Sequence, residues 1–201
     1  MTWQDLNNLY KGQDCIFVGR GPTLDDWLSH GCPRSPDSVV IGINSACLVT
    51  PCEFSVSADA DANLIADAPT RWVRGIPYLI EDKEQWTLPA QTSDLWWLHS
   101  ENTPTGRTRR LDQTRDEIAE SRQLYCSTSS AHPAIHFAWY LGFERLMTVG
   151  IDGCVGRCKA TEYAPGKPPP PEKVYAEMRK TSEFLLNRLF PHCWARWHHA
   201  P

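Results

Sequence analysis

Residues 15–24 of the chain read CIFVGRGPTL, and this stretch decides the predicted fold. An apolar run stops at Gly19, a second glycine follows at position 21, and Thr23 opens a segment with helical spacing. The pattern predicts a buried strand that turns tightly into a helix, leaving backbone N–H groups unpaired beside the positive end of the helix dipole. Phosphate binds such turns. We therefore expect a phosphate-binding site at Gly19, Arg20, Gly21 and Pro22.

The composition is typical of a globular domain. The chain has 201 residues, of which 41% are hydrophobic, enough for one domain with a core. No apolar run approaches the roughly 18–20 residues that cross a bilayer, and the first residues lack the apolar part of a signal peptide, so we expect a cytoplasmic protein without a membrane span. The eight cysteines form no Cys-x-x-Cys pair, which favours reduced thiols. The net charge of -4 makes nucleic acid a less favoured partner.

Short apolar runs alternate with helical patterns along the chain. The predicted strands are 14–18, 39–43, 54–58, 72–76 with 78–80, 94–99 as an edge strand, 123–126 and 146–151. The predicted helices are 2–10, one beginning near residue 23, one from 114 onward, 131–141 and 172–190. A polar excursion near 100–122 and a Pro-rich loop near 154–171 are the main irregular segments. This alternation predicts an α/β fold over residues 1–201, a single Rossmann-like domain with a mostly parallel sheet flanked by helices.

Polar residues gather where the predicted strands end. Ligands of open α/β sheets bind outside the carboxyl ends of the strands. Amide and hydroxyl groups there suit a nucleotide, and carboxylates suit a sugar hydroxyl or a metal ion. The predicted nucleotide-binding residues are Gly19, Arg20, Gly21, Pro22, Asn44, Ser45, Ser127, Thr128, Ser129 and Ser130. The candidate catalytic carboxylates are Asp152 and Asp59, and the candidate metal ligands are Asp59 and Asp61.

Several of these segments resemble a known group of proteins. Residues 18–24, VGRGPTL, are similar to the G-N-G-P-S-L turn of family 42 sialyltransferases and of the related domain-of-unknown-function 115 proteins, which include archaeal 6-hydroxymethylpterin pyrophosphokinases. Residues 41–44 resemble their second strand with its terminal asparagine. Residues 127–131, 141–146 and 150–152 resemble their G-T-S helix, G-Y/F-K/R-x-I strand and G-I/V-D signature. The resemblance implies a Rossmann-like fold that holds a nucleotide between the first turn, Asn44 and the serine-rich turn. Arg20 stands where the family has asparagine, and no histidine lies between positions 152 and 171, where the sialyltransferases have their base.

These observations favour a glycosyltransferase-like enzyme whose donor substrate is a nucleotide sugar, with an acceptor that the sequence does not identify. The turn amides and Arg20 would stabilise charge on the leaving phosphate, while a carboxylate acts as base or binds a divalent ion. Two alternatives stay open. One is a Mg²⁺-dependent pyrophosphokinase or phosphotransferase that acts on ATP, with Asp59 and Asp61 as ligands. The other is a non-catalytic nucleotide-binding module, with which the missing histidine is compatible.

The remaining clusters have simpler interpretations. His132 and His136 are one helical turn apart, a spacing that suits a metal ion, but we expect packed or surface histidines instead. The spacings of Cys154, Cys158, His192, Cys193, His198 and His199 match no common zinc module, so zinc is not expected. Arginines between 107 and 115 are interleaved with acidic residues, which disfavours nucleic acid. The nine tryptophans suit packing in a core or between the subunits of an oligomer.

Overall fold

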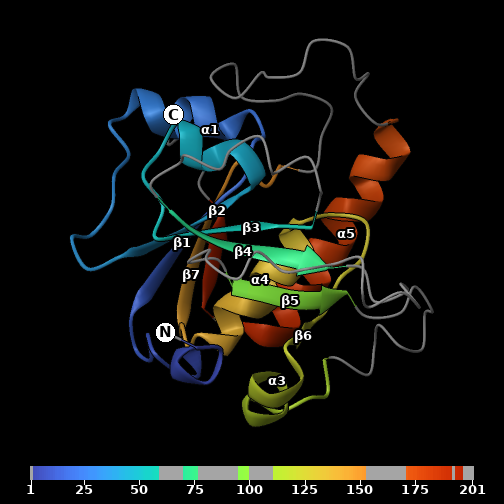
Figure 1. Ribbon diagram of the computed structural model, residues 1–201. Helices are drawn as coiled ribbons and strands as arrows, with labels where there is room; N and C mark the ends of the chain where they lie inside the picture. Colours follow the sequence, from blue (N-terminus) through green and yellow to red (C-terminus); the bar gives the residue numbers. More distant parts are fainter. Residues whose placement is uncertain are drawn as a thin grey trace.

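One parallel sheet organises the chain in the computed structural model (Figure 1), which describes residues 2–58, 70–76, 95–99, 111–152, 171–191 and 193–196. The sheet has eight strands in the order β6-β5-β4-β3-β2-β1-β7-β8, and each neighbouring pair is parallel. The strands are β1 Asp14–Val18, β2 Val39–Ile43, β3 Phe54–Ser57, β4 Arg71–Ile76, β5 Leu95–His99, β6 Gln123–Leu124, β7 Arg145–Val149 and β8 Trp194–Arg196. The α/β, Rossmann-like prediction is confirmed.

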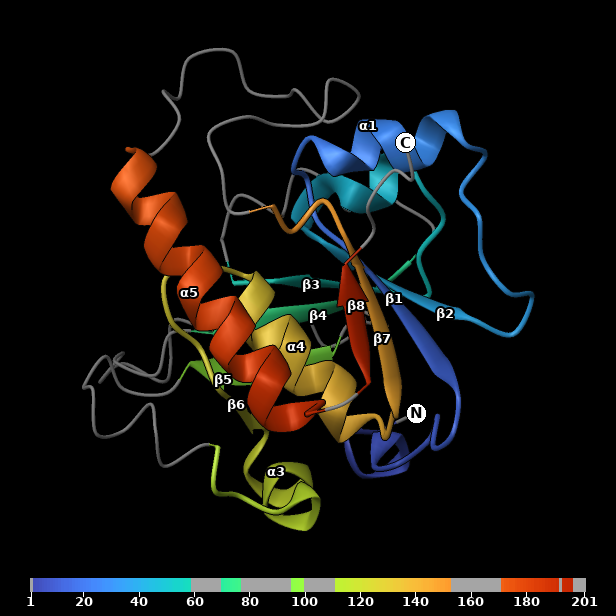
Figure 2. The same ribbon diagram turned by 180° about the vertical axis from the view of Figure 1, so that it is seen from behind.

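Helices cover both faces of the sheet. In the described residues the α-helices are α1 Thr23–Ser29, α3 Arg115–Ser121, α4 Ala131–Tyr140 and α5 Glu172–Leu189, and the 3-10 helices are η1 Gln4–Leu6 and η2 Asn44–Leu48. Helices α4 and α5 lie against one face (Figure 2), while α1 and η2 pack against the other. None of the helices that the structure describes is long and apolar enough to span a bilayer.

The strand sequences explain why the sheet is covered on both sides. Alternate residues of a strand point to opposite faces, so Cys15 and Phe17 join the core beneath α4, while Ile16 and Val18 join the core beneath α1. All four are at most 3% exposed. A continuous apolar run is the pattern that two buried faces require.

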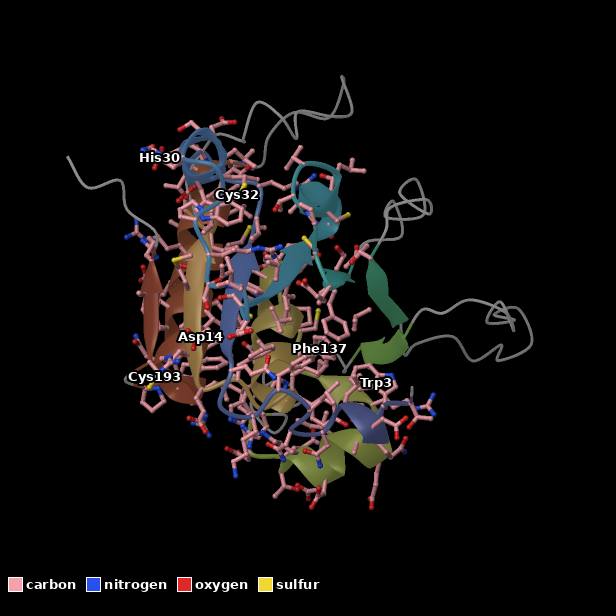
Figure 3. All side chains as sticks on the ribbon, turned by 90° about the vertical axis from the view of Figure 1, so that its left-hand side faces the viewer. Trp3, Asp14, His30, Cys32, Phe137 and Cys193 are labelled. Atoms are coloured by element: carbon pink, nitrogen blue, oxygen red, sulfur yellow. The ribbon has the colours of Figure 1, made fainter. Side chains whose placement is uncertain are left out.

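The N-terminal segment closes the amino end of the sheet. The ring of Trp3 packs edge-on against Phe137 of α4, with ring centroids 5.7 Å apart, and the two residues lie together at this end in Figure 3. Backbone bonds from Asn8 N to Tyr140 O and from Tyr10 N to Leu141 O continue the contact past the end of α4. The figure also places Asp14 toward this end and His30 and Cys32 at the opposite, carboxyl end.

Several local predictions need correction. The predicted helix over 2–10 is reduced to the three-residue η1, because bonds to the end of α4 hold residues 8–10. Strand β5 lies between β4 and β6 and is not an edge strand. The edge beside β7 is formed by β8, which was not among the predicted strands. Residues 78–80, 101–110 and 153–170 lie outside the described residues.

The order of the strands locates the carboxyl crevice. The chain runs outward from β1 through β2, β3, β4 and β5 to β6, and then returns to the other side of β1 as β7. The direction of strand order therefore reverses between β1 and β7. In open α/β sheets the crevice at such a reversal is where ligands bind. The segments that follow β1 and β7 therefore border the expected ligand crevice.

Candidate functional site

The glycine turn after β1 is bonded to the end of β7. The N–H of Gly19 donates to Val149 O at 2.7 Å, and the N–H of Gly21 donates to Gly150 O at 2.7 Å. The sequence interpretation expected these amides to be unpaired and directed outward, and for Gly19 and Gly21 that expectation is wrong. Because β1 and β7 are parallel neighbours, their pairing continues past the strand ends into the turn.

Asp152 binds the first residue of α1. Thr23 donates its backbone N–H to Asp152 Oδ2 at 2.9 Å and its hydroxyl to Asp152 Oδ1 at 2.7 Å. The Thr23 hydroxyl also accepts the N–H of Gly150 at 2.8 Å. A carboxylate at the start of a helix satisfies amides that have no partner within the helix and interacts favourably with the helix dipole. We call Gly19, Gly21, Thr23, Gly150 and Asp152 together the β1–β7 clasp.

Close packing explains the glycines of the clasp. A Cβ atom at Gly21 would lie 2.2 Å from Asp152 Oδ2 and 2.8 Å from Gly150 O. A Cβ atom at Gly19 would lie 2.4 Å from Gly150 O. Gly150 itself has φ +66°, a conformation that favours glycine. The space beside the glycine turn is therefore filled by the protein's own Asp152 and β7 backbone.

Removing the Asp152 carboxylate tests whether the clasp is structural. We expect Asp152→Ala to lower the free energy of unfolding by about 1–2 kcal/mol, as loss of a helix-capping side chain does. Urea unfolding measures the change, and Asp37→Ala, on the exposed loop before β2, is the control. Thr23→Val removes the hydroxyl that bonds to the same carboxylate. The Asp152→Ala/Thr23→Val double variant should therefore lose less unfolding free energy than the sum of the losses in the two single variants. An unchanged unfolding curve for Asp152→Ala would contradict the capping role.

The segment after β2 contacts the segment after β1. Asn44, the first residue of η2, has φ +51°, a left-handed conformation that asparagine adopts more readily than most residues. Ser45 follows it and is fully buried, with 0% exposure. Its hydroxyl accepts a hydrogen bond from Arg20 Nη1 at 3.3 Å. Arg20 is only partly buried, so this bond joins a guanidinium at the surface to a hydroxyl in the interior.

The serine-rich turn after β6 is tied to the end of β3. Ser130 Oγ accepts the N–H of Ala58 at 3.1 Å, and Ser129 Oγ accepts the N–H of Ala131 at 3.2 Å. Ser130 is buried, whereas Thr128 is exposed. Both serine hydroxyls therefore hold backbone segments in place at the carboxyl end of the sheet. Asp59 and Asp61, which come next after β3, lie outside the described residues.

The two histidines of α4 are packed in the core. Each is 0% exposed. His136 Nδ1 accepts the N–H of Tyr125 at 2.8 Å, and His132 Nε2 lies 3.3 Å from Met178 O of α5. Burial lowers the pKa of His136 to about 3. Within the described ranges no group of three or more metal-ligating side chains comes together, and the six cysteines there are free thiols.

The bond partners within the site were not visible in the sequence. Thr23 opens α1 as predicted, and the cap residue before it, Pro22, makes no side-chain bond to the helix. Thr23 binds Asp152, which lies 129 residues away in the chain. No local pattern could have paired them. Comparison of the chain with protein-family models, with curated proteins and with solved structures finds no match.

Proposed function

We propose that the chain is a transferase that uses a nucleotide-activated sugar, with the nucleotide bound at the carboxyl ends of β1, β2 and β3. The observation that supports this proposal most directly is the Arg20–Ser45 contact. It holds a cationic side chain at 3.3 Å from the Ser45 hydroxyl, directly after the strand where the sheet order reverses. A guanidinium is a good partner for phosphate. A fixed positive charge there would stabilise the leaving phosphate during transfer.

Asn44 and the serine-rich turn support the same ligand. They follow β2 and β6, so they belong to the carboxyl edge that also includes Arg20. Amide and hydroxyl groups at this edge suit the polar edges of a base or sugar. A sheet in which eight parallel strands share this edge provides a rigid support for such a ligand.

One observation favours a second candidate. Both carboxylate oxygens of Asp152 accept hydrogen bonds from Thr23, at 2.7 and 2.9 Å. A carboxylate held in this way is a poorer general base than one that faces a substrate. A nucleotide-binding module that does not turn over its ligand is therefore the alternative that the geometry supports.

A thermal-unfolding panel tests the proposal. The chain is heated with UDP- and CMP-sugars, UDP, CMP, ADP and ATP, each with Mg²⁺ or with EDTA. We expect a nucleotide sugar at about 100 times its Kd to stabilise the chain by about 2.7 kcal/mol, which corresponds to roughly 5–10 °C in Tm. Stabilisation by ATP only with Mg²⁺ would favour phosphoryl or pyrophosphoryl transfer instead. No shift with any nucleotide would contradict nucleotide binding.

Turnover separates the two candidates. The stabilising nucleotide sugar is incubated with the chain, and the products are separated by chromatography. Release of UDP or CMP is expected for a transferase, because water can take the place of the missing acceptor and hydrolyse the donor slowly. Stabilisation without release would favour the non-catalytic module.

A further inference from the structure

We propose that Ser45 is a positioning residue for Arg20, and that this guanidinium, and not the glycine-turn amides, recognises the ligand's phosphate. The inference rests on the proposed function and specifies how its site selects an anion. In this proposal Ser45 affects binding by holding the Arg20 side chain in place. The sequence alone had predicted that Ser45 contacts the nucleotide directly.

Burial excludes direct contact between Ser45 and a ligand. Ser45 is 0% exposed and lies within η2, which follows β2 in the chain and contacts both β2 and β3. Its hydroxyl oxygen accepts the Nη1–H of Arg20 at 3.3 Å. Arg20 remains partly exposed. The Arg20 bond is therefore a route by which the buried Ser45 hydroxyl can act on a ligand at the surface.

The β1–β7 clasp explains why a side chain has to supply the charge. The N–H groups of Gly19 and Gly21 donate to Val149 O and Gly150 O. The first amide of α1, that of Thr23, donates to the Asp152 carboxylate. Three amides that could cradle phosphate in a glycine-rich turn, those of Gly19, Gly21 and Thr23, are thus engaged within the protein. Arg20 is the cationic side chain in the middle of this turn.

Anchoring the guanidinium lowers the entropic cost of binding. Arginine has many rotamers, and holding one of them for a ligand costs conformational entropy. A hydrogen bond to a fixed, buried hydroxyl restricts those rotamers before the ligand arrives. Loss of the hydroxyl should weaken binding of the charged part of a ligand and leave the uncharged part unaffected.

The experiment compares nucleotides with their nucleosides by isothermal titration calorimetry on the full chain. The probes are UDP, CMP and ADP, each beside uridine, cytidine or adenosine. The variants are Arg20→Gln, Ser45→Ala, the double variant and Ser55→Ala. Ser55 is the matched control, because it is also 0% exposed but its hydroxyl is 3.4 Å from Thr70 Oγ1. Ser45→Cys, which nearly keeps the side-chain volume, replaces Ser45→Ala if the alanine variant has a lowered Tm.

The proposal predicts that the variants lose affinity for the nucleotide but not for the nucleoside. Arg20→Gln should weaken binding of the best nucleotide by about 10–100-fold, as loss of a charge-assisted bond does. Ser45→Ala should weaken it by roughly 3–10-fold, and the double variant should match Arg20→Gln, because Ser45 acts only through Arg20. Binding of the nucleoside should not change in any variant, and Ser55→Ala should bind like the wild type.

Other outcomes overturn the inference. Additive losses would show that Ser45 acts independently of Arg20. Equal losses for nucleotide and nucleoside would show a general structural effect. If the Arg20→Gln variant binds the nucleotide as tightly as the wild type does, the guanidinium is not the group that recognises the anion. The proposed function would stay intact in that case. A wild-type chain that binds none of the probes would remove the proposed function itself and this inference with it.

Discussion

Replacing Gly19 with alanine is expected to lower the free energy of unfolding by about 3 kcal/mol or more, near the upper end of what overpacking costs. The added Cβ would lie 2.4 Å from Gly150 O and 2.5 Å from Cδ1 of Ile151. The Gly150 oxygen is a backbone atom that accepts the N–H of Gly21, so it cannot move alone. Relief of the clash requires the ends of β1 and β7 to separate, which breaks the clasp. Denaturant unfolding followed by tryptophan fluorescence measures the loss.

Gly12→Ala is the control for Gly19→Ala. Gly12 has φ +81°, and no atom lies within 4 Å of the position that an added Cβ would take. Alanine there meets only the conformational cost of the left-handed region, about 1 kcal/mol. The difference in unfolding free energy between the two variants measures the cost of the clash between the added Cβ at position 19 and the end of β7. Equal losses would show that the strand ends relax easily and that close packing does not require glycine at position 19.

The strands that the sequence predicted best are those with the strongest local pattern. The bounds of β1 and β2 match the predicted 14–18 and 39–43, because each is a continuous apolar run that ends in a polar turn. The short β8 was missed, since Trp194–Arg196 has only three residues and its pairing partner, Leu146–Thr148, is distant in sequence. The neighbours of β5 were also misjudged, because the order of strands is set by contacts between segments far apart in the chain.

The same limit applies to the candidate site. The sequence located the turn at Gly19–Gly21 and the carboxylate at Asp152 at the carboxyl ends of predicted strands. It could not show that the carboxylate binds the start of α1, because that depends on the distance between two loops. Residues that suit a phosphate are also residues that let two loops pack closely. Glycine and a small hydroxyl serve both purposes, and only the geometry distinguishes them.

Acid is expected to destabilise the fold through His136. Burial lowers the pKa of its imidazole from 6.5 to about 3, so the folded state keeps the ring neutral over a range in which the unfolded state binds a proton. The unfolded state therefore binds more protons, and stability falls as pH falls. The contribution is fully present above about pH 6.5 and is lost between there and about pH 3. At pH 5 the loss from this group is about 2 kcal/mol.

His136→Gln isolates this contribution. Glutamine does not titrate, and its amide oxygen can accept the N–H of Tyr125 in place of Nδ1. We expect the difference in unfolding free energy between wild type and variant to change by about 2 kcal/mol from pH 8 to pH 5, with the wild type losing more. Parallel pH profiles for wild type and His136→Gln would contradict the prediction.

The surroundings of His136 explain why protonation is so costly. Nδ1 accepts the Tyr125 N–H, so the proton of the neutral ring is on Nε2, and a second proton would break that bond. The ring stacks on Trp139, with centroids 5.7 Å apart, and the guanidinium of Arg115 lies 4.5 Å from the centroid of the same tryptophan. Burial, which removes the water that would solvate an imidazolium, is the cause of the lowered pKa of His136. In ¹⁵N NMR of the folded chain, the ring should therefore stay in the Nε2–H form at pH 5, and a titration midpoint near the ordinary value of 6.5 would show that water reaches it.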